Sequence, residues 1–184
     1  MEIKGKNALV TGGAIRIGKA ISSELAKHGV NIALHYHSSV DSAIAIKPEL
    51  ESEGIRVGLF QQDLSETEAL PAFFSHIIET FGQIDILINN AGIYPRDRLK
   101  NLKIDTLEAL FGINLYAPLV LMREFAKQIP EDGHGKIINI IDAKIFKHDP
   151  ETFMYRLSKV ALWEATKLAA MELAPNITVN AISP

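Results

Sequence analysis

The sequence contains no cysteine in its 184 residues. Disulfide bridges, thiolate metal sites and cysteine nucleophiles are therefore excluded. It also lacks a basic tail or a block of like charges. Its 22 acidic residues outnumber the 19 basic ones, which gives a net charge of −3. This balance does not support a nucleic-acid or other polyanionic partner.

Long apolar runs are missing as well. The longest ones, such as residues 137–141, are far too short to span a bilayer. The first six residues alternate polar and apolar side chains and do not resemble a signal peptide. We expect a soluble, cytoplasmic protein with no membrane partner. The length and the apolar fraction of 47% suit one domain with a sizeable core.

Two patterns alternate strictly along the chain. Short apolar runs predict strands at residues 7–10, 30–36, 56–61, 84–89, 136–141 and 177–181. Stretches with helical spacing lie between them, at residues 16–28, 41–53, 65–81, 105–129 and 152–173. Such alternation produces parallel strands with right-handed crossovers. We predict an α/β fold, a doubly wound parallel sheet of the Rossmann type, in a single domain over residues 1–184.

Local signals refine two of the predicted helices. Pro48 and Pro71 lie inside helical stretches, so we expect these helices to be kinked or to begin late. Ser65 and Glu68 have the spacing of a capping box, which predicts a helix start at Ser65.

A glycine-rich turn follows the first predicted strand and opens a helix. It reads Thr11-Gly12-Gly13-Ala14-Ile15-Arg16-Ile17-Gly18. Such a turn directs free backbone N–H groups and the positive end of the helix dipole at a pyrophosphate. Gly12 allows the tight turn, and Gly18 allows close contact between helix and strand. The strand-turn-helix context favours cofactor binding over a plain turn.

This turn resembles the cofactor fingerprint of the short-chain dehydrogenase/reductase family, Thr-Gly-x-x-x-Gly-x-Gly, with one departure. Arg16 occupies the position of the middle glycine, and in this the chain is similar to the pteridine reductase and dihydromonapterin reductase branch. A guanidinium beside the adenosine ribose would pair with a 2′-phosphate. The alternative is an arginine that merely extends along the first helical turn.

The second predicted strand has no acidic residue at its end. NAD-binding units use one there to hold the ribose hydroxyls, whereas this strand ends in His35-Tyr36-His37-Ser38. The donors Arg16, His37 and Ser38 favour a ribose that carries a phosphate, so the predicted cofactor is NADP(H). His35 and His37 share one strand face and could bind a metal instead. No third ligand is in view, and we predict no metal site.

Two further strand ends resemble family motifs. Asp63-Leu64 resembles the acidic position that contacts adenine, although an acid at a helix N-terminus would look the same. Asn89-Asn90-Ala91-Gly92 matches the family's Asn-Asn-Ala-Gly motif, whose small residues let the backbone approach the nicotinamide ribose.

A tyrosine and a lysine lie one helical turn apart in Tyr155-Arg156-Leu157-Ser158-Lys159, and so on one helix face. An ammonium beside a phenol lowers the pKa of the phenol, which suits general acid–base catalysis. In the family this pair transfers the proton, and the lysine also contacts the nicotinamide ribose. The resemblance assigns to the cofactor, in all, Thr11, Gly12, Arg16, Ile17, Gly18, His37, Ser38, Asp63, Leu64, Asn90, Ala91, Gly92, Tyr155 and Lys159.

Asp142 stands thirteen residues before Tyr155, where the family usually has a serine that polarises the substrate carbonyl. An aspartate there again resembles the pteridine reductase branch. A carboxylic acid can protonate a ring nitrogen, and a carboxylate can anchor an amino group. Asp142 therefore favours an imine or pterin-like substrate over a simple ketone. The alternative is a solvated aspartate at a strand end.

Two more positions complete the predicted site. Asn114 matches the family's helical asparagine, whose main-chain carbonyl holds a relay water. Pro118 lies four residues later and has no N–H to bond that carbonyl, although a proline-kinked packing helix is the plain alternative. Tyr94 lies where the pteridine reductase branch carries an aromatic residue that stacks on the substrate.

Several of these positions fall at the carboxyl ends of different predicted strands, which form one crevice in an open parallel sheet. They are Thr11 and Gly12, His37 and Ser38, Asp63, Asn89 and Asn90, and Asp142. We predict an NADPH-dependent reductase that transfers hydride to a C=N or C=O bond of a small, pteridine-like molecule. The alternatives are a 3-oxoacyl-(acyl-carrier-protein) reductase or other carbonyl reductase, and a catalytically silent NADP(H)-sensing or scaffold protein.

The family resemblance also implies a homo-oligomer, a tetramer or dimer, formed through the predicted helices at residues 105–129 and 152–173. Their apolar faces fit this, and fit burial in the core equally. In the family another strand and a substrate-covering segment follow the sixth strand, after which this sequence ends at Pro184. We therefore expect the domain to be incomplete at its C-terminus.

Overall fold

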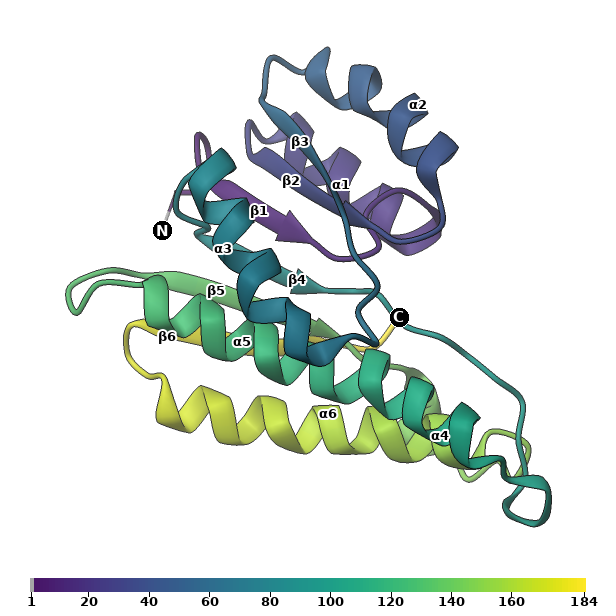
Figure 1. The fold of residues 1–184 in the computed structure, drawn as a ribbon. Coiled ribbons are helices and arrows are strands. Elements are labelled where there is room, and N and C mark those ends of the chain that lie inside the picture. The colour runs from purple at the N-terminus through teal and green to yellow at the C-terminus, as the bar shows by residue number, and fades with distance from the viewer. Residues whose placement is uncertain (1) are drawn as a thin grey trace.

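Six parallel strands form one sheet in the computed structural model, which describes residues 2–184 (Figure 1). The chain runs outward from β1 to β3, returns to β4 beside β1, and runs outward again to β6. This reversal of direction confirms the predicted doubly wound sheet. The strands, in the order of the sheet, are β3 (Val57–Gln61), β2 (Asn31–Tyr36), β1 (Asn7–Val10), β4 (Ile86–Asn89), β5 (Gly135–Ile140) and β6 (Ile177–Ile182).

Helices cover both faces of this sheet (Figure 1). One face is covered by α1 (Arg16–Lys27) and α2 (Val40–Glu51). The other is covered by α3 (Leu70–Phe81), α5 (Ala117–Gln128) and α6 (Phe153–Glu172), with α4 (Ile104–Phe111) preceding α5.

The strand residues alternate between two cores. Leu9, Leu87 and Ile137 pack on the side of α3 and α5, whereas Val10 and Ile88 pack on the side of α1 and α2. Both sets are buried, because a parallel sheet has helices on either side. This explains why the strands read as nearly continuous apolar runs in the sequence.

The helix α3 begins later than the capping-box spacing of Ser65 and Glu68 predicts. A 3₁₀ turn, η1 (Thr67–Ala69), comes first, and α3 starts with Pro71 in its first turn. The backbone N–H of Ser65 donates to the Asp63 carboxylate at 2.9 Å, and its hydroxyl donates at 2.7 Å. Ser65 is thus part of an Asx turn and caps no helix. The late start expected from Pro71 is confirmed, whereas α2 continues through Pro48.

The helix predicted at residues 105–129 consists of three segments. A π-helical turn, η3 (Gly112–Tyr116), separates α4 from α5. Pro118 follows directly and cannot donate to the carbonyl of Asn114, so the expected irregularity takes the form of this π turn. By length and composition alone, Ile104–Gln128 could cross a membrane. Its residues Leu110, Leu121 and Phe125 are fully buried in the protein, so we assign it to the core.

Phe125 allows a test of this packing. It is fully buried on α5, and a Cβ on Gly135 of β5 would lie only 2.6 Å from its ring. Phe125→Ala should lower the free energy of unfolding by about 3–5 kcal/mol, because the lost contacts leave a cavity. Urea denaturation measures this. The control Ile44→Ala, at a residue that is 58% exposed on α2, should change it by less than about 0.5 kcal/mol. Equal effects of the two substitutions would contradict the packing described.

Candidate active site

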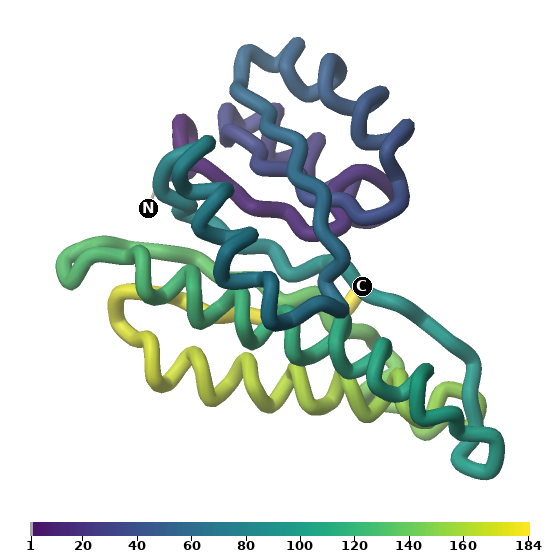
Figure 2. The backbone as a smooth tube through the Cα atoms, viewed as in Figure 1, coloured from purple at the N-terminus to yellow at the C-terminus, as the bar shows by residue number. Residues whose placement is uncertain are grey.

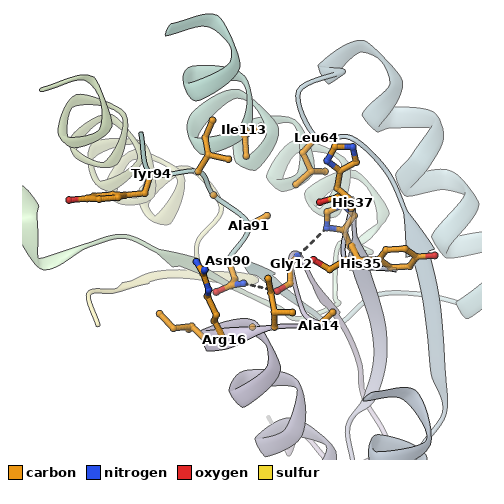
Figure 3. Close-up of a pocket in the computed structure, with 18 of the residues that line it drawn as sticks. Gly12, Ala14, Arg16, His35, His37, Leu64, Asn90, Ala91, Tyr94 and Ile113 are labelled. Carbon is orange, nitrogen blue, oxygen red and sulfur yellow. Dashed lines mark hydrogen bonds between the residues drawn. The ribbon is translucent and has the colours of Figure 1, made fainter. Parts of the chain in front are cut away.

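The carboxyl ends of five strands surround one cavity of about 490 Å³ (Figure 3). A second cavity of about 200 Å³ adjoins it and shares several wall residues with it, Tyr94, Asp142 and Tyr155 among them. The second cavity is also lined by Lys159 and by Pro184, at the C-terminal end in Figure 2. Of the residues predicted from the sequence, the first cavity is lined by Gly12, Arg16, Ile17, Gly18, His37, Ser38, Asp63, Leu64, Asn90, Ala91, Gly92, Tyr94, Asp142 and Tyr155.

The loop between β1 and α1 forms a cradle of backbone. Gly12 has a φ of 61°, a conformation that favours glycine. A Cβ on Gly18 would lie 1.9 Å from the carbonyl oxygen of Gly12, so no side chain fits there. The first turn of α1 has no side-chain cap. Its uncapped N–H groups and the helix dipole suit a phosphate group at this end of the cavity.

Arg16 adopts an unusual backbone conformation at the rim of this cradle. It has a φ of 49°, and no other non-glycine residue described in residues 2–184 has a positive φ. The left-handed region costs an L-residue about 1–2 kcal/mol. A glycine would adopt this backbone conformation without strain. The side chain of Arg16 is exposed. Strain retained at a cavity rim is typical of a ligand contact.

His35 fixes the same loop by hydrogen bonds, a role that the sequence analysis missed. Its Nδ1 accepts the N–H of Gly12 at 3.1 Å (dashed in Figure 3), and its Nε2 bonds the carbonyl of Gln62 at 3.0 Å. Its own carbonyl accepts the N–H of Gly13 at 3.0 Å. Burial lowers the pKa of His35 to about 4, so the ring is neutral at pH 7 and Nδ1 is free to accept. Both ring nitrogens are committed, which removes His35 as a metal ligand.

The other end of the first cavity is lined by His37, Ser38, Asp63 and Leu64. His37 Nε2 lies 3.7 Å from the Asp63 carboxylate. The bonds that Asp63 accepts from the backbone and hydroxyl of Ser65 lower its pKa. Asp63 therefore has two functions in this structure: it closes its own turn and faces the cavity.

Thr11 does not line either cavity, and its part in cofactor binding stays a prediction. It is 1% exposed because its hydroxyl binds backbone groups on β4 and the loop after it. The Thr11 oxygen accepts the N–H groups of Asn90 and Ala91 at 2.9 and 3.0 Å. The Asn90 amide in turn donates to the carbonyls of Thr11 and Gly12. These bonds join the glycine loop to the loop after β4.

Asn114 is fully buried in the π turn and likewise lines neither cavity. Its side-chain oxygen accepts the N–H of Ile93 at 2.9 Å, and its amide donates to the carbonyl of Ile93 at 3.0 Å. The amide also donates to the Ser158 hydroxyl at 3.2 Å. The side chain thus ties the loop after β4 to α6. The relay water at its main-chain carbonyl stays a prediction.

Tyr155 and Asp142 are hydrogen-bonded to each other. The Tyr155 hydroxyl donates to Asp142 Oδ2 at 2.7 Å, and the other carboxylate oxygen accepts the backbone N–H of Lys144 at 2.7 Å. Burial and the Asp142 carboxylate raise the pKa of Tyr155. The predicted lowering of this pKa by Lys159 is therefore wrong for this structure, because burial and the hydrogen bond to Asp142 both favour the protonated phenol.

Lys159 is almost fully buried and donates to the carbonyl of Ile140 at 2.8 Å. Burial lowers its pKa to about 8, and the charge of Asp142 opposes this change. The ammonium form thus still prevails at pH 7.

Tyr94 is exposed and packs against Tyr155. Its ring contacts that of Tyr155 edge-on, with centroids 4.5 Å apart. The Lys144 ammonium bonds the Tyr94 hydroxyl and lies 3.3 Å from the Asp149 carboxylate. The predicted substrate-stacking residue is therefore at the shared wall of the two cavities and is held by a lysine that the sequence analysis did not single out.

Comparison with known proteins gives consistent matches over the whole chain. Residues 6–184 match the sequence model of the short chain dehydrogenase family. The 3-oxoacyl-(acyl-carrier-protein) reductase FabG of Staphylococcus epidermidis is 31% identical over 180 residues, which are 97% of this chain and 74% of that protein.

Solved structures resemble the fold closely. FolM alternative dihydrofolate reductase 1 from Brucella canis, complexed with NADP, superposes with a TM-score of 0.92 at 38% identity. A short chain dehydrogenase from Burkholderia cenocepacia, in complex with NADP, gives a TM-score of 0.93 at 34% identity. Each match covers 100% of this chain and 75% of the other.

The neutral state of His35 predicts how stability depends on pH. The pKa of His35 is about 4 in the folded chain and 6.5 in the unfolded chain, so the unfolded state takes up the proton first as the pH falls. The contribution is fully present above pH 6.5 and is lost progressively toward pH 4, by up to about 3 kcal/mol. Urea denaturation across this range should show a smaller pH effect for His35→Gln than for the wild type. The same pH dependence in both proteins would refute this account.

Proposed function

Because the chain belongs to the short-chain dehydrogenase family, we propose that it is an NADPH-dependent reductase of a C=N or C=O bond, with a pteridine-like substrate. The observation that carries the proposal is the 2.7 Å bond between Tyr155 and Asp142 at the wall shared by the two cavities. Two neighbours in structure are NADP complexes, and one is named an alternative dihydrofolate reductase.

The first cavity would hold the cofactor along its length. The backbone of the glycine loop would bind the pyrophosphate, and Arg16, His37 and Ser38 would surround the phosphate-bearing ribose. Asp63 and Leu64 would contact the adenine. Asn90, Gly92 and Lys159 line the second cavity and, together with Ala91 of the first, would border the nicotinamide end. Bound NADPH supplies the hydride.

Tyr155 would act as the proton donor. Its raised pKa means that the phenol keeps its proton at neutral pH, as a general acid must before it reacts. A substrate atom that accepts this proton would replace Asp142 as the partner of the hydroxyl. The Lys159 ammonium would then stabilise the phenolate left behind, because it is held on the same face of α6.

Asp142 favours a nitrogen-containing substrate. A carboxylate accepts hydrogen bonds from amino and ring N–H groups and repels the oxygen of a carbonyl. The second candidate function is reduction of a 3-oxoacyl thioester, which the similarity to FabG favours. The two candidate functions differ in the substrate group that would face Asp142, an N–H group or a carbonyl oxygen. An assay with one substrate of each kind therefore distinguishes them.

An assay of NADPH oxidation tests this proposal with biopterin and with a 3-oxoacyl thioester. We expect turnover with biopterin only, and Tyr155→Phe should lower kcat about 10²–10⁴-fold because the proton donor is lost. The dissociation constant for NADPH should stay within about twofold, since Tyr155 forms no part of the phosphate cradle. Faster turnover of the thioester would favour the second function. Tight NADPH binding without any turnover would indicate a sensing or scaffold protein.

Arg16→Gly should change affinity and stability in opposite directions. Loss of the charged pair with the 2′-phosphate should weaken NADPH about 10–100-fold and leave NADH nearly unchanged. Glycine relieves the positive φ, so the free energy of unfolding without cofactor should rise or stay level. Titration of both dinucleotides and urea denaturation measure these effects. Equal weakening of NADPH and NADH would rule out the phosphate contact.

A further inference from the structure

The helix α6, which carries Tyr155, is capped by a residue from another part of the chain. Its own N-cap residue, Thr152, makes no side-chain cap bond. Instead, the N–H of Met154 donates to the carboxylate of Asp97, at 3.2 Å from Oδ1 and 3.3 Å from Oδ2. A carboxylate at this point satisfies an N–H that the helix leaves unpaired and interacts favourably with the helix dipole.

Backbone contacts fix Asp97 in this place. Its N–H donates to the carbonyl of Glu151 at 2.9 Å, and it forms an isolated parallel bridge with Thr152. The side chains of Arg98 and Glu151 form an ion pair beside it. The segment at residues 97–98 therefore lies directly along the start of α6.

The same loop is also fixed at its beginning. Asn114 binds both backbone polar groups of Ile93, and the next residue, Tyr94, contacts the ring of Tyr155. The loop at residues 93–98 thus connects the buried π turn with the first turn of α6. It contacts this turn in two places, at the ring of Tyr155 and at the N–H of Met154.

We propose that Asp97 is a positioning residue that sets where α6 begins and thereby holds the Tyr155 hydroxyl against Asp142; the catalytic part of this inference rests on the proposed function. Met154 immediately precedes Tyr155, so the bond to Asp97 acts one residue from the reacting side chain. Each residue turns an α-helix by about 100°. An altered start of the helix would therefore turn the Tyr155 ring away from the cavities.

A purely structural role would have a different signature. General destabilisation weakens NADPH binding as well as turnover. Loss of positioning lowers kcat alone, because the phosphate cradle is built from β1, β2 and α1 and does not contact Asp97. Asparagine in place of Asp97 keeps an oxygen that can accept the N–H of Met154, so it should restore function.

Steady-state kinetics with NADPH and biopterin test the catalytic part. Asp97→Ala should lower kcat about 10–100-fold with the NADPH dissociation constant within about twofold. Asp97→Asn should recover most of the loss, and the control Arg98→Ala, which removes only the neighbouring ion pair, should resemble the wild type. A kcat of Asp97→Ala close to that of the wild type would overturn the proposal. So would parallel losses of kcat and NADPH affinity that asparagine does not recover.

Nuclear magnetic resonance of labelled tyrosine tests the placement without any turnover. The chain has four tyrosines, so Tyr155→Phe identifies the ring signal of Tyr155. This signal should shift or broaden in Asp97→Ala and stay in place in Asp97→Asn and Arg98→Ala. An unshifted signal in Asp97→Ala refutes the inference by itself. A further outcome is that the wild type reduces neither substrate while the Tyr155 signal still shifts in Asp97→Ala. That result would refute the proposed function and leave the positioning role supported.

Discussion

A parallel sheet that is covered by helices on both faces leaves polar side chains very little room. Inside the sheet, a polar group without a hydrogen-bond partner costs several kcal/mol. One buried chain of hydrogen bonds runs from Asn89, which donates to Asn139, to Thr166, which accepts from Asn139. Within residues 2–184, the side-chain oxygen of Asn89 is left without a partner. Of the polar positions singled out from the sequence, those that line the first cavity where the strands end include Arg16, His37, Ser38, Asp63, Asn90 and Asp142. The cavities, and the proposed chemistry within them, depend on this constraint.

The elements that depend on local pattern were predictable from the sequence. The strands and the doubly wound sheet follow from apolar runs and from the rules of parallel crossovers, and the glycine loop follows from its place between a strand and a helix. The start of α3 was not predictable from spacing alone. The Ser65 side chain can either cap a helix or hydrogen-bond to Asp63. Pro71 delays the start of α3, so Ser65 bonds to Asp63.

Contacts between distant segments account for the errors. The spacing of Tyr155 and Lys159 predicts that they share a helix face, but it does not say what each one faces. In the folded chain the phenol faces the carboxylate of Asp142, and the ammonium faces the carbonyl of Ile140. Burial is the main cause of both pKa shifts, and the Asp142 carboxylate adds to the one of Tyr155 and opposes the one of Lys159. His35 was missed for the same reason, because its bond to Gly12 joins a strand to a loop that is distant from it in sequence.

The two hydrogen bonds between the Asn114 side chain and the backbone of Ile93 limit how the site can adapt. A loop that is held through both its N–H and its carbonyl cannot swing outward without breaking both hydrogen bonds to the fully buried Asn114 side chain. Space for a larger ligand must come from side chains, and Tyr94 is a large, exposed one at the wall between the cavities. Substrate preference could thus diverge through exchanges at the rim of this pocket, while the backbone that aligns the reacting groups is inherited unchanged.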